Sequence, residues 1–226
     1  MCLNVTSGHP ERSGMSSRKE RNVFPSEAEC PPERSRGMAD FLSNQFSKKF
    51  KSMKWRIDPA HSEIQFRVKH LMITNVTGYF RKFDLELETD SDDFNTAKNI
   101  VFTADINSID TNSDQRDTHL KSEDFFHAQK YPQIKFEGKK YEGAGDSAKL
   151  HGDLTIRGIT KPITLNVEFG GIVTDPYGQT KAGFTVEGKI SRKEYGLEWN
   201  AVTEAGKIVV GDDIKIHADI QVVKQK

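Results

Sequence analysis

The sequence predicts an all-β protein whose strands run antiparallel and close into a barrel. From Met53 onward, apolar and polar residues alternate with a period of two, as in strands with one buried face and one solvated face. Gly, Pro, Asn and Asp interrupt these runs where turns are needed. The runs number about nine, more than one flat sheet holds comfortably, so we expect the sheet to close on itself.

The first 52 residues are expected to form an extension outside this domain, which spans 53–226. Residues 1–37 are rich in Ser, Pro, Glu and Arg and lack apolar periodicity, which predicts disorder. Within 40–51, Leu42, Phe46 and Phe50 recur at four-residue spacing beside lysines, the pattern of a short amphipathic helix. Such a helix either packs loosely on the domain or lies at a membrane surface as a lid.

The strands are predicted from residues at alternate positions whose side chains should share the inner face of the sheet. Gly143-Ala144-Gly145-Asp146 and Asp175-Pro176-Tyr177-Gly178 supply the residues that tight turns require, which favours hairpins and an antiparallel order. In chain order, the inward residues are Trp55 and Ile57; Ile64, Phe66 and Val68; Val76, Gly78 and Phe80; Phe83, Leu85 and Leu87; Ile100, Phe102, Ala104 and Ile106; Ile134 and Phe136; Leu150, Leu154 and Ile156; Ile163, Leu165, Val167 and Phe169; Ala182, Phe184, Val186 and Ile190; and Ile214, Ile216, Ala218, Ile220 and Val222.

Residues 113–128 interrupt the alternation. Their charged residues and the pair Phe125-Phe126 predict a helical or irregular excursion that ends before Pro132 and caps one end of the barrel. The pair Asp212-Asp213 is interpreted as a turn immediately before the last strand, which is expected to begin at Ile214.

The composition argues against several classes of partner. Lysine plus arginine equals aspartate plus glutamate, at 33 each, so no net basic field attracts nucleic acid or an anionic membrane. Both cysteines, Cys2 and Cys30, precede the domain, which should therefore be stable without a disulfide. No window resembles a secretory or membrane-spanning segment, so we expect a cytoplasmic protein that is not integral to a membrane.

Common catalytic and metal-binding patterns are absent from the sequence. It contains no Gly-x-Ser-x-Gly, His-Glu-x-x-His or phosphate-loop motif, and no two histidines stand at i+2 or i+4. We therefore expect no metal site, no cofactor and no enzymatic activity. One cluster leaves an alternative open, because Arg116, Asp117 and His119 lie within four residues and either hold the excursion in place or orient one another for chemistry.

The strongest positive signal is aromatic. Phenylalanine occurs 14 times, against five tyrosines and two tryptophans, and six phenylalanines fall on the apolar faces of separate strands. A packed core explains this composition equally well, but a barrel of about nine strands can leave an apolar cavity. Burying about ten methylenes there would provide ~8 kcal/mol before ordering costs, enough to hold a lipid tail.

Several motifs in order resemble the YceI-like, polyisoprenoid-binding family over about residues 53–226. The matching segments are Trp55-x-Ile57-Asp58-Pro59-Ala60-His61-Ser62-x-Ile64-x-Phe66-x-Val68-Lys69-His70; Gly78-x-Phe80; Arg116-Asp117-x-His119-Leu120-x-Ser122-x-Asp124-Phe125-Phe126; Tyr131-Pro132-x-Ile134-x-Phe136; Leu154-Thr155-Ile156-Arg157-Gly158-Ile159-Thr160-Lys161-Pro162; Ala182-Gly183-Phe184; Ser191-Arg192-x-x-Tyr195-Gly196-Leu197; and Gly211-Asp212-Asp213-Ile214. The resemblance implies a lipocalin-like barrel, often dimeric, with an elongated pocket for an isoprenoid, quinone or fatty-acid-like tail. Many members are periplasmic and carry a signal peptide, a pattern from which this sequence departs.

These observations predict a lipid carrier, store or sequestering protein. Arg116, His119 or Arg192 is expected to meet a polar head group near the barrel opening. The alternatives are an enzyme acting on an isoprenoid or quinone through His119 and Asp117, and a stress-response interaction module with a packed barrel. The residues expected to line the tail pocket are Phe66, Val68, Phe80, Phe102, Ile134, Phe136, Leu154, Ile156, Phe169, Phe184 and Ile190.

Overall fold

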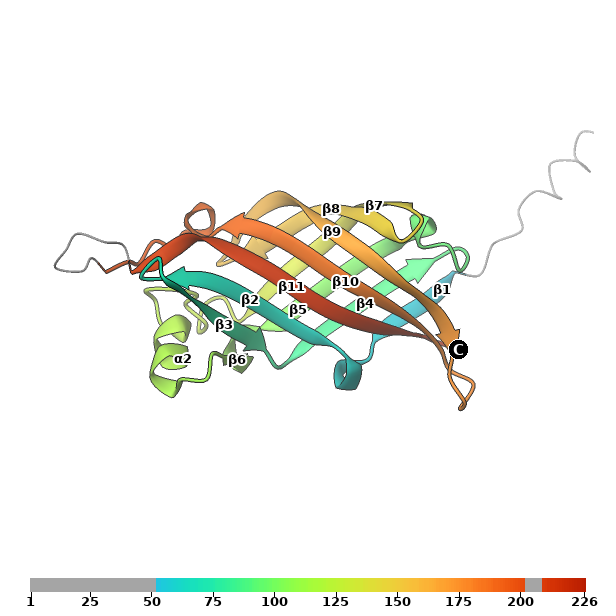
Figure 1. The fold of residues 1–226 in the computed structure, drawn as a ribbon, viewed down its shortest axis with the longest axis horizontal. Helices are drawn as coiled ribbons and strands as arrows, with labels where there is room; N and C mark the ends of the chain where they lie inside the picture. The colour runs from blue at the N-terminus through green and yellow to red at the C-terminus, as the bar shows by residue number, and fades with distance from the viewer. Residues whose placement is uncertain (1–51, 202–208) are drawn as a thin grey trace, which may run out of the picture. The chain divides into compact units, whose positions relative to one another are not determined.

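The alternating segments form antiparallel strands in the computed structural model, which describes residues 52–201 and 209–226 (Figure 1). The expected disorder over 1–37 and helix over 40–51 lie outside the described residues. The strands are β1 (Met53–Ile57), β2 (Glu63–His70), β3 (Thr74–Phe80), β4 (Phe83–Thr89), β5 (Lys98–Asp105), β6 (Ile109–Asp110), β7 (Gln133–Ala144), β8 (Ser147–Ile156), β9 (Ile159–Thr174), β10 (Thr180–Ser191) and β11 (Val210–Lys224).

Eight of these strands close into a ring. Their order is β1-β4-β5-β7-β8-β9-β10-β11, and β11 returns to β1, where Trp55 lies opposite Lys224 and Ile57 lies opposite Val222. Along residues 210–219, β11 instead pairs with β2, which carries β3 and the two-residue strand β6. The prediction of a closed antiparallel barrel is therefore confirmed.

The described residues contain more strands than the alternation indicated. Eleven are present instead of about nine, partly because β6 is too short to produce an alternating pattern. Sharp corners also divide the first part of the chain into short strands: a 3₁₀ turn, η1 (Pro59–His61), separates β1 from β2, and Arg81 and Lys82 separate β3 from β4.

Both predicted hairpin turns are present. Between β7 and β8, Gly145 has φ +63°, a conformation that glycine adopts without a steric cost. Between β9 and β10, the Asp175 carboxylate accepts hydrogen bonds from the backbone N–H groups of Tyr177 and Gln179, and Gly178 has φ +78°. These local contacts fix the register of the hairpins.

The interpretation of Asp212-Asp213 as a turn before the last strand is wrong. Strand β11 begins at Val210, and the two aspartates lie inside it where the pairing with β2 shifts register between Val210 and Ile214. Asp212 accepts a hydrogen bond from the buried guanidinium of Arg192. The need for a carboxylate beside this cation explains an acidic residue within a strand.

The excursion over 113–128 contains one α-helix, as expected. Helix α2 (Asp114–Lys121) follows Ser113 and carries Asp114 and Asp117 in its first turn, where carboxylates favour the positive end of the helix dipole. It lies with β6 at one end of the barrel (Figure 1), and Phe125 and Phe126 after it are buried. Among the described residues, no helix is long and apolar enough to cross a membrane.

Candidate functional site

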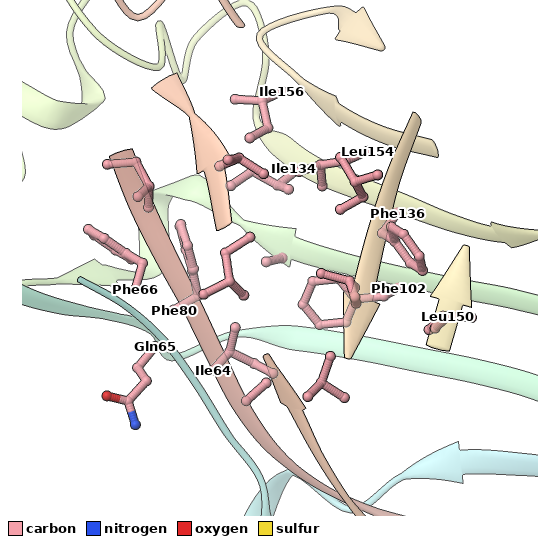
Figure 2. Close-up of a pocket in the computed structure, with 18 of the residues that line it drawn as sticks. Ile64, Gln65, Phe66, Phe80, Phe102, Ile134, Phe136, Leu150, Leu154 and Ile156 are labelled. Atoms are coloured by element: carbon pink, nitrogen blue, oxygen red, sulfur yellow. The ribbon is translucent and has the colours of Figure 1, made fainter. Parts of the chain in front are cut away.

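The barrel encloses an apolar cavity of about 230 Å³. The cavity is lined by side chains from nine strands: β2, β3, β4, β5, β7, β8, β9, β10 and β11. Leu120 near the end of α2, and Phe125 and Phe126 after this helix, also line it. Figure 2 shows that the labelled Phe, Ile and Leu residues project from different strands toward a common interior. Apart from Gln65, Tyr141 and Arg192, the residues on the lining are apolar. Water would find few hydrogen-bond partners in this cavity.

Most residues assigned to the tail pocket line this cavity in the structure. Phe169 does not; its ring packs 5.6 Å from that of Phe94 and 5.3 Å from that of Phe184, measured between ring centroids. Strand alternation gives the side of the sheet but not the length of the cavity along a strand. The residues that line the cavity are Phe66, Val68, Phe80, Phe102, Ile134, Phe136, Leu154, Ile156, Phe184 and Ile190.

The close approach of an aromatic side chain explains one glycine on β3. Gly78 on β3 lies opposite Phe66 on β2, and a Cβ atom at Gly78 would collide with the Phe66 ring. The missing side chain leaves this ring room to lie across the sheet and contact Phe80, whose centroid is 5.6 Å away. Any larger residue at Gly78 would require the Phe66 ring and the Thr111 side chain to move.

The end of the barrel near α2 contributes cavity residues that were not assigned to the pocket from the sequence. Leu120, Phe125 and Phe126 line the cavity, and the Phe126 ring meets the edge of Phe80 at 6.4 Å between centroids. The adjacent phenylalanines in an otherwise polar segment were the available signal, because paired aromatic residues are rarely exposed together. The excursion therefore closes this end of the barrel with apolar side chains.

Arg192 is a buried charge that the protein itself satisfies. It lies in the 3₁₀ turn η4 (Arg192–Tyr195), and its side chain is 2% exposed. Burial lowers the pKa of Arg192, and the carboxylate of Asp212 opposes this shift. An arginine has five N–H donors, and the structure supplies five acceptors. They are the carbonyl oxygens of Leu197, Trp199, Val210 and Gly211 and the carboxylate of Asp212.

This arrangement bears on the head-group role expected for Arg192. Although Arg192 lines the cavity, a ligand could bind its guanidinium only by displacing one of these acceptors. Its observed contacts join η4 to the start of β11 across residues far apart in the sequence. Head-group binding by Arg192 stays a prediction.

Arg116, Asp117 and His119 lie on α2, where Arg116 and Asp117 share Thr111 as a partner and His119 has a different one. The guanidinium of Arg116 donates to the Thr111 hydroxyl at 2.7 Å, and the buried carboxylate of Asp117 accepts from the Thr111 backbone N–H at 3.0 Å. His119 Nε2 lies 3.1 Å from a carboxylate oxygen of Asp124. Asp117 and His119 are therefore not joined as the acid/base pair considered from the sequence.

The His119 ring belongs to an aromatic cluster at the same end of the barrel. Its edge-on contacts have centroid distances of 5.0 Å to Phe125 and 4.7 Å to Trp199. His119 and Arg116 do not line the cavity, but Phe125 does. The contacts expected between a polar head group and Arg116 or His119 would therefore form outside the apolar interior.

Tyr195 presents a buried hydroxyl beside this region. The side chain is 1% exposed, and its hydroxyl has no hydrogen-bond partner among the residues that the structure describes. Burial, with a smaller contribution from Glu194, raises the pKa of Tyr195 to about 12. The phenol consequently stays protonated at neutral pH.

The acidic residues near Asp93 form a turn. Asp93 accepts from the Asn95 backbone N–H at the start of a 3₁₀ turn, η2 (Phe94–Thr96), while Asp90 pairs with Lys98 at 2.6 Å. Within 52–201 and 209–226, no group of three or more His, Cys, Asp or Glu side chains has an arrangement that could hold a metal ion.

Known proteins share this sequence pattern and fold. Residues 55–222 match the model of the YceI-like domain. The chain belongs to the YceI-like family. A UPF0312 protein of Staphylococcus aureus (strain bovine RF122 / ET3-1) is 42% identical over 165 residues, which cover 73% of this YceI-like chain and 94% of the relative.

Solved structures support the same assignment of the YceI-like chain. The Campylobacter jejuni YceI protein is 34% identical to it with a TM-score of 0.60, and the match covers 70% of this chain and 90% of that protein. A polyisoprenoid binding domain from Saccharophagus degradans has a TM-score of 0.53 at 14% identity, covering 76% of this chain and 98% of the domain. This second similarity concerns the fold alone.

Proposed function

We propose that the barrel binds the apolar chain of a long lipid and thereby carries, stores or sequesters it. The observation that carries this proposal is the cavity inside the barrel, whose lining is almost entirely aliphatic and phenyl. Each methylene transferred from water into it contributes about 0.8 kcal/mol before ordering costs. A polar ligand would lose hydrogen bonds to water and find few replacements on this lining.

The volume of the cavity favours a slim chain. At about 230 Å³ it lies slightly below the ~300–1,000 Å³ usual for small-molecule pockets. Phe66, Phe102 and Phe184 line it and are only partly buried, and we expect their rings to change rotamer to admit a longer chain. We expect a polyisoprenoid, an isoprenoid quinone or a fatty-acid derivative, and the polyisoprenoid binding domain with the same fold supports the first of these.

A fluorescent long-chain fatty acid titrated into the protein tests the proposal. Ala218 lines the cavity, so Ala218→Leu should occupy part of it and weaken binding on the order of tenfold. Ala144→Leu makes the same chemical change at an exposed position and should leave binding unchanged. Equal affinity of both variants and the original protein, with folding verified by circular dichroism, would contradict binding in the cavity.

For the head group, we propose contacts with Arg116 and His119 at the α2 end. Arg116 is exposed; its Nε donates to the Thr111 hydroxyl and its Nη2 to the Thr111 carbonyl, and its other N–H groups are left for a ligand. Arg116→Gln should weaken binding of a lipid with an anionic head severalfold and leave a neutral lipid unaffected. An identical loss for both lipids would show that Arg116 acts through the fold of this end.

A further inference from the structure

The loop between β2 and β3 places apolar residues in a backbone conformation that disfavours them. Leu71 has φ +51° and Met72 has φ +60°, and the Ile73 N–H donates to the His70 carbonyl at 3.1 Å. Two successive left-handed residues are normally supplied by Asn and Gly, because a Cβ atom is strained there. Local folding therefore does not explain Leu and Met at these positions.

The side chains of Met72 and Ile73 are also unusually exposed. Met72 is 59% exposed and Ile73 is 76% exposed, which leaves adjacent large apolar groups in water. We call Leu71, Met72 and Ile73 the apolar tip. Single exposed apolar residues are common, but adjacent ones at the end of a hairpin mark a contact surface.

The apolar tip lies at one end of the cavity. The Leu71 N–H donates to the Val209 carbonyl at 2.8 Å, which attaches the tip to the start of β11. Val68 just before the tip and Val210 both line the cavity. In Figure 1, this end of β2 and β3 lies at the same end of the barrel as α2.

Cations occupy neighbouring positions on the outer face behind the tip. Arg67 on β2 lies opposite Lys215 on β11, and Lys215 lies opposite Lys189 on β10. All three side chains are exposed, and we call them the cation row. Like charges directly opposite each other destabilise a sheet, so this row favours an anionic partner.

The surrounding carboxylates only partly neutralise the cation row. Lys189 pairs with Asp213 at 2.8 Å, but Arg67 and Lys215 form no ion pair with any carboxylate in the described part of the chain. Lys69, nearer the tip, is exposed as well. Farther along the same strands, Glu187 and Asp219 face His217.

Although the chain as a whole carries no net charge, its cations are concentrated locally in this row, and we propose that the apolar tip and the cation row together dock the protein on an anionic lipid bilayer. Arg67 precedes Leu71 by four residues, which is about 13 Å along a strand. Side chains of the tip can therefore enter the boundary of the acyl chains while the cations remain near the lipid phosphates. Docking in this way brings one end of the cavity to the membrane, but it does not depend on what the cavity binds.

Co-sedimentation of the full chain with vesicles tests this proposal. The protein should bind vesicles of equimolar phosphatidylcholine and phosphatidylglycerol, but not vesicles of phosphatidylcholine alone, and high salt should release it. Met72→Gly with Ile73→Thr should weaken binding on the order of tenfold without loss of folding, because glycine suits the positive φ at position 72. Val173→Thr, which removes an apolar side chain 63% exposed on β9, is the control and should bind normally.

The charge contribution is tested separately. Arg67→Gln with Lys215→Gln should weaken binding at low salt on the order of tenfold or more. Lys139→Gln with Lys140→Gln removes the same charge from exposed positions on β7 and should have a much smaller effect. Equal binding to both kinds of vesicle, or normal binding by the tip variant, would overturn the proposal. A tip variant that changes the protein from dimer to monomer in light scattering would likewise overturn it, because a second copy would then cover the tip.

Discussion

Arg192 joins the segment after β10 to the start of β11 through hydrogen bonds to backbone carbonyl groups and Asp212. We expect Arg192→Ala to lower the free energy of unfolding by about 3–5 kcal/mol, because several buried acceptors lose their donor. Urea denaturation measures this change. Arg116→Ala, at an exposed site, should cost less than about 1 kcal/mol. Equal stability of the Arg192→Ala variant and the original protein would contradict the structural role of Arg192.

Removal of the Tyr195 hydroxyl should not destabilise the protein, in contrast to the loss of the Arg192 side chain. At neutral pH, Tyr195→Phe should leave stability unchanged or raise it by up to about 1 kcal/mol, since the buried hydroxyl has no partner among the described residues. The pKa of Tyr195 is raised to about 12, so the original protein should lose stability as pH rises from about 10, the pKa of an unfolded tyrosine. Tyr195→Phe should not show the loss of stability that ionisation of this tyrosine causes. Urea denaturation at increasing alkaline pH measures this difference. An equal loss of stability in the original protein and in Tyr195→Phe would contradict the account.

For individual residues, the sequence predicts the position of side chains that follow the strand alternation. The alternation of Phe66, Phe102 and Phe136 with polar residues was sufficient to place their rings in the barrel interior. It could not reveal the environment of Arg192, because four of its five acceptors are backbone carbonyl groups that any sequence would supply.

Among the elements, the corner between β1 and β2 depends on Asp58. Its carboxylate accepts hydrogen bonds from the Ala60 backbone N–H and from Gln221 on β11, and lies 2.9 Å from His61 Nδ1. Burial raises the pKa of Asp58, but the hydrogen bonds from His61, Ala60 and Gln221 outweigh it, so the pKa lies below its usual value. The charged carboxylate therefore stabilises this corner.

The depressed pKa of Asp58 predicts the direction of a pH effect. The stabilisation is present above the unfolded pKa of about 4 and is lost as pH falls through the lower folded value. Asp58→Asn should be less stable than the original protein at neutral pH, and the difference should shrink below about pH 4. Urea midpoints across this range measure it. A difference that stays constant with pH would contradict the role of the ionised carboxylate.

Element boundaries were harder to predict than element type. Helix α2 lies within the expected excursion, and the hairpin turns lie where Gly145 and Gly178 indicate. The start of β11 was misplaced because its register shift and the pairing of Asp212 with Arg192 depend on a distant part of the chain. Local periodicity contains no information about such contacts.

For the whole molecule, barrel closure depends on pairing between β1 and β11, which lie at opposite ends of the described chain. The number of amphipathic strands made closure predictable, because an open sheet of that size would expose long edges. The cavity was not predictable from the residues alone. A packed barrel and a hollow one have similar inward-facing residues. Whether space remains between these side chains depends on how rings such as Phe66 lie over Gly78.

Lipid binding should also stabilise the whole barrel. A ligand that binds only the folded state raises the free energy of unfolding by about 2.7 kcal/mol when its free concentration is a hundred times Kd. Thermal unfolding with and without added long-chain lipid measures this shift. Ala218→Leu should show a smaller shift than Ala144→Leu, because only the first substitution occupies the cavity. Equal shifts would indicate binding elsewhere on the protein.

The most direct test of the central claim is mass spectrometry of an organic extract of the protein purified from its native source under non-denaturing conditions. The account predicts a long-chain, predominantly apolar lipid in near-stoichiometric amount, which is greatly reduced in the Ala218→Leu protein. A protein that contains no lipid and also takes up none when lipids are supplied, or one that retains a small polar ligand instead, would contradict it.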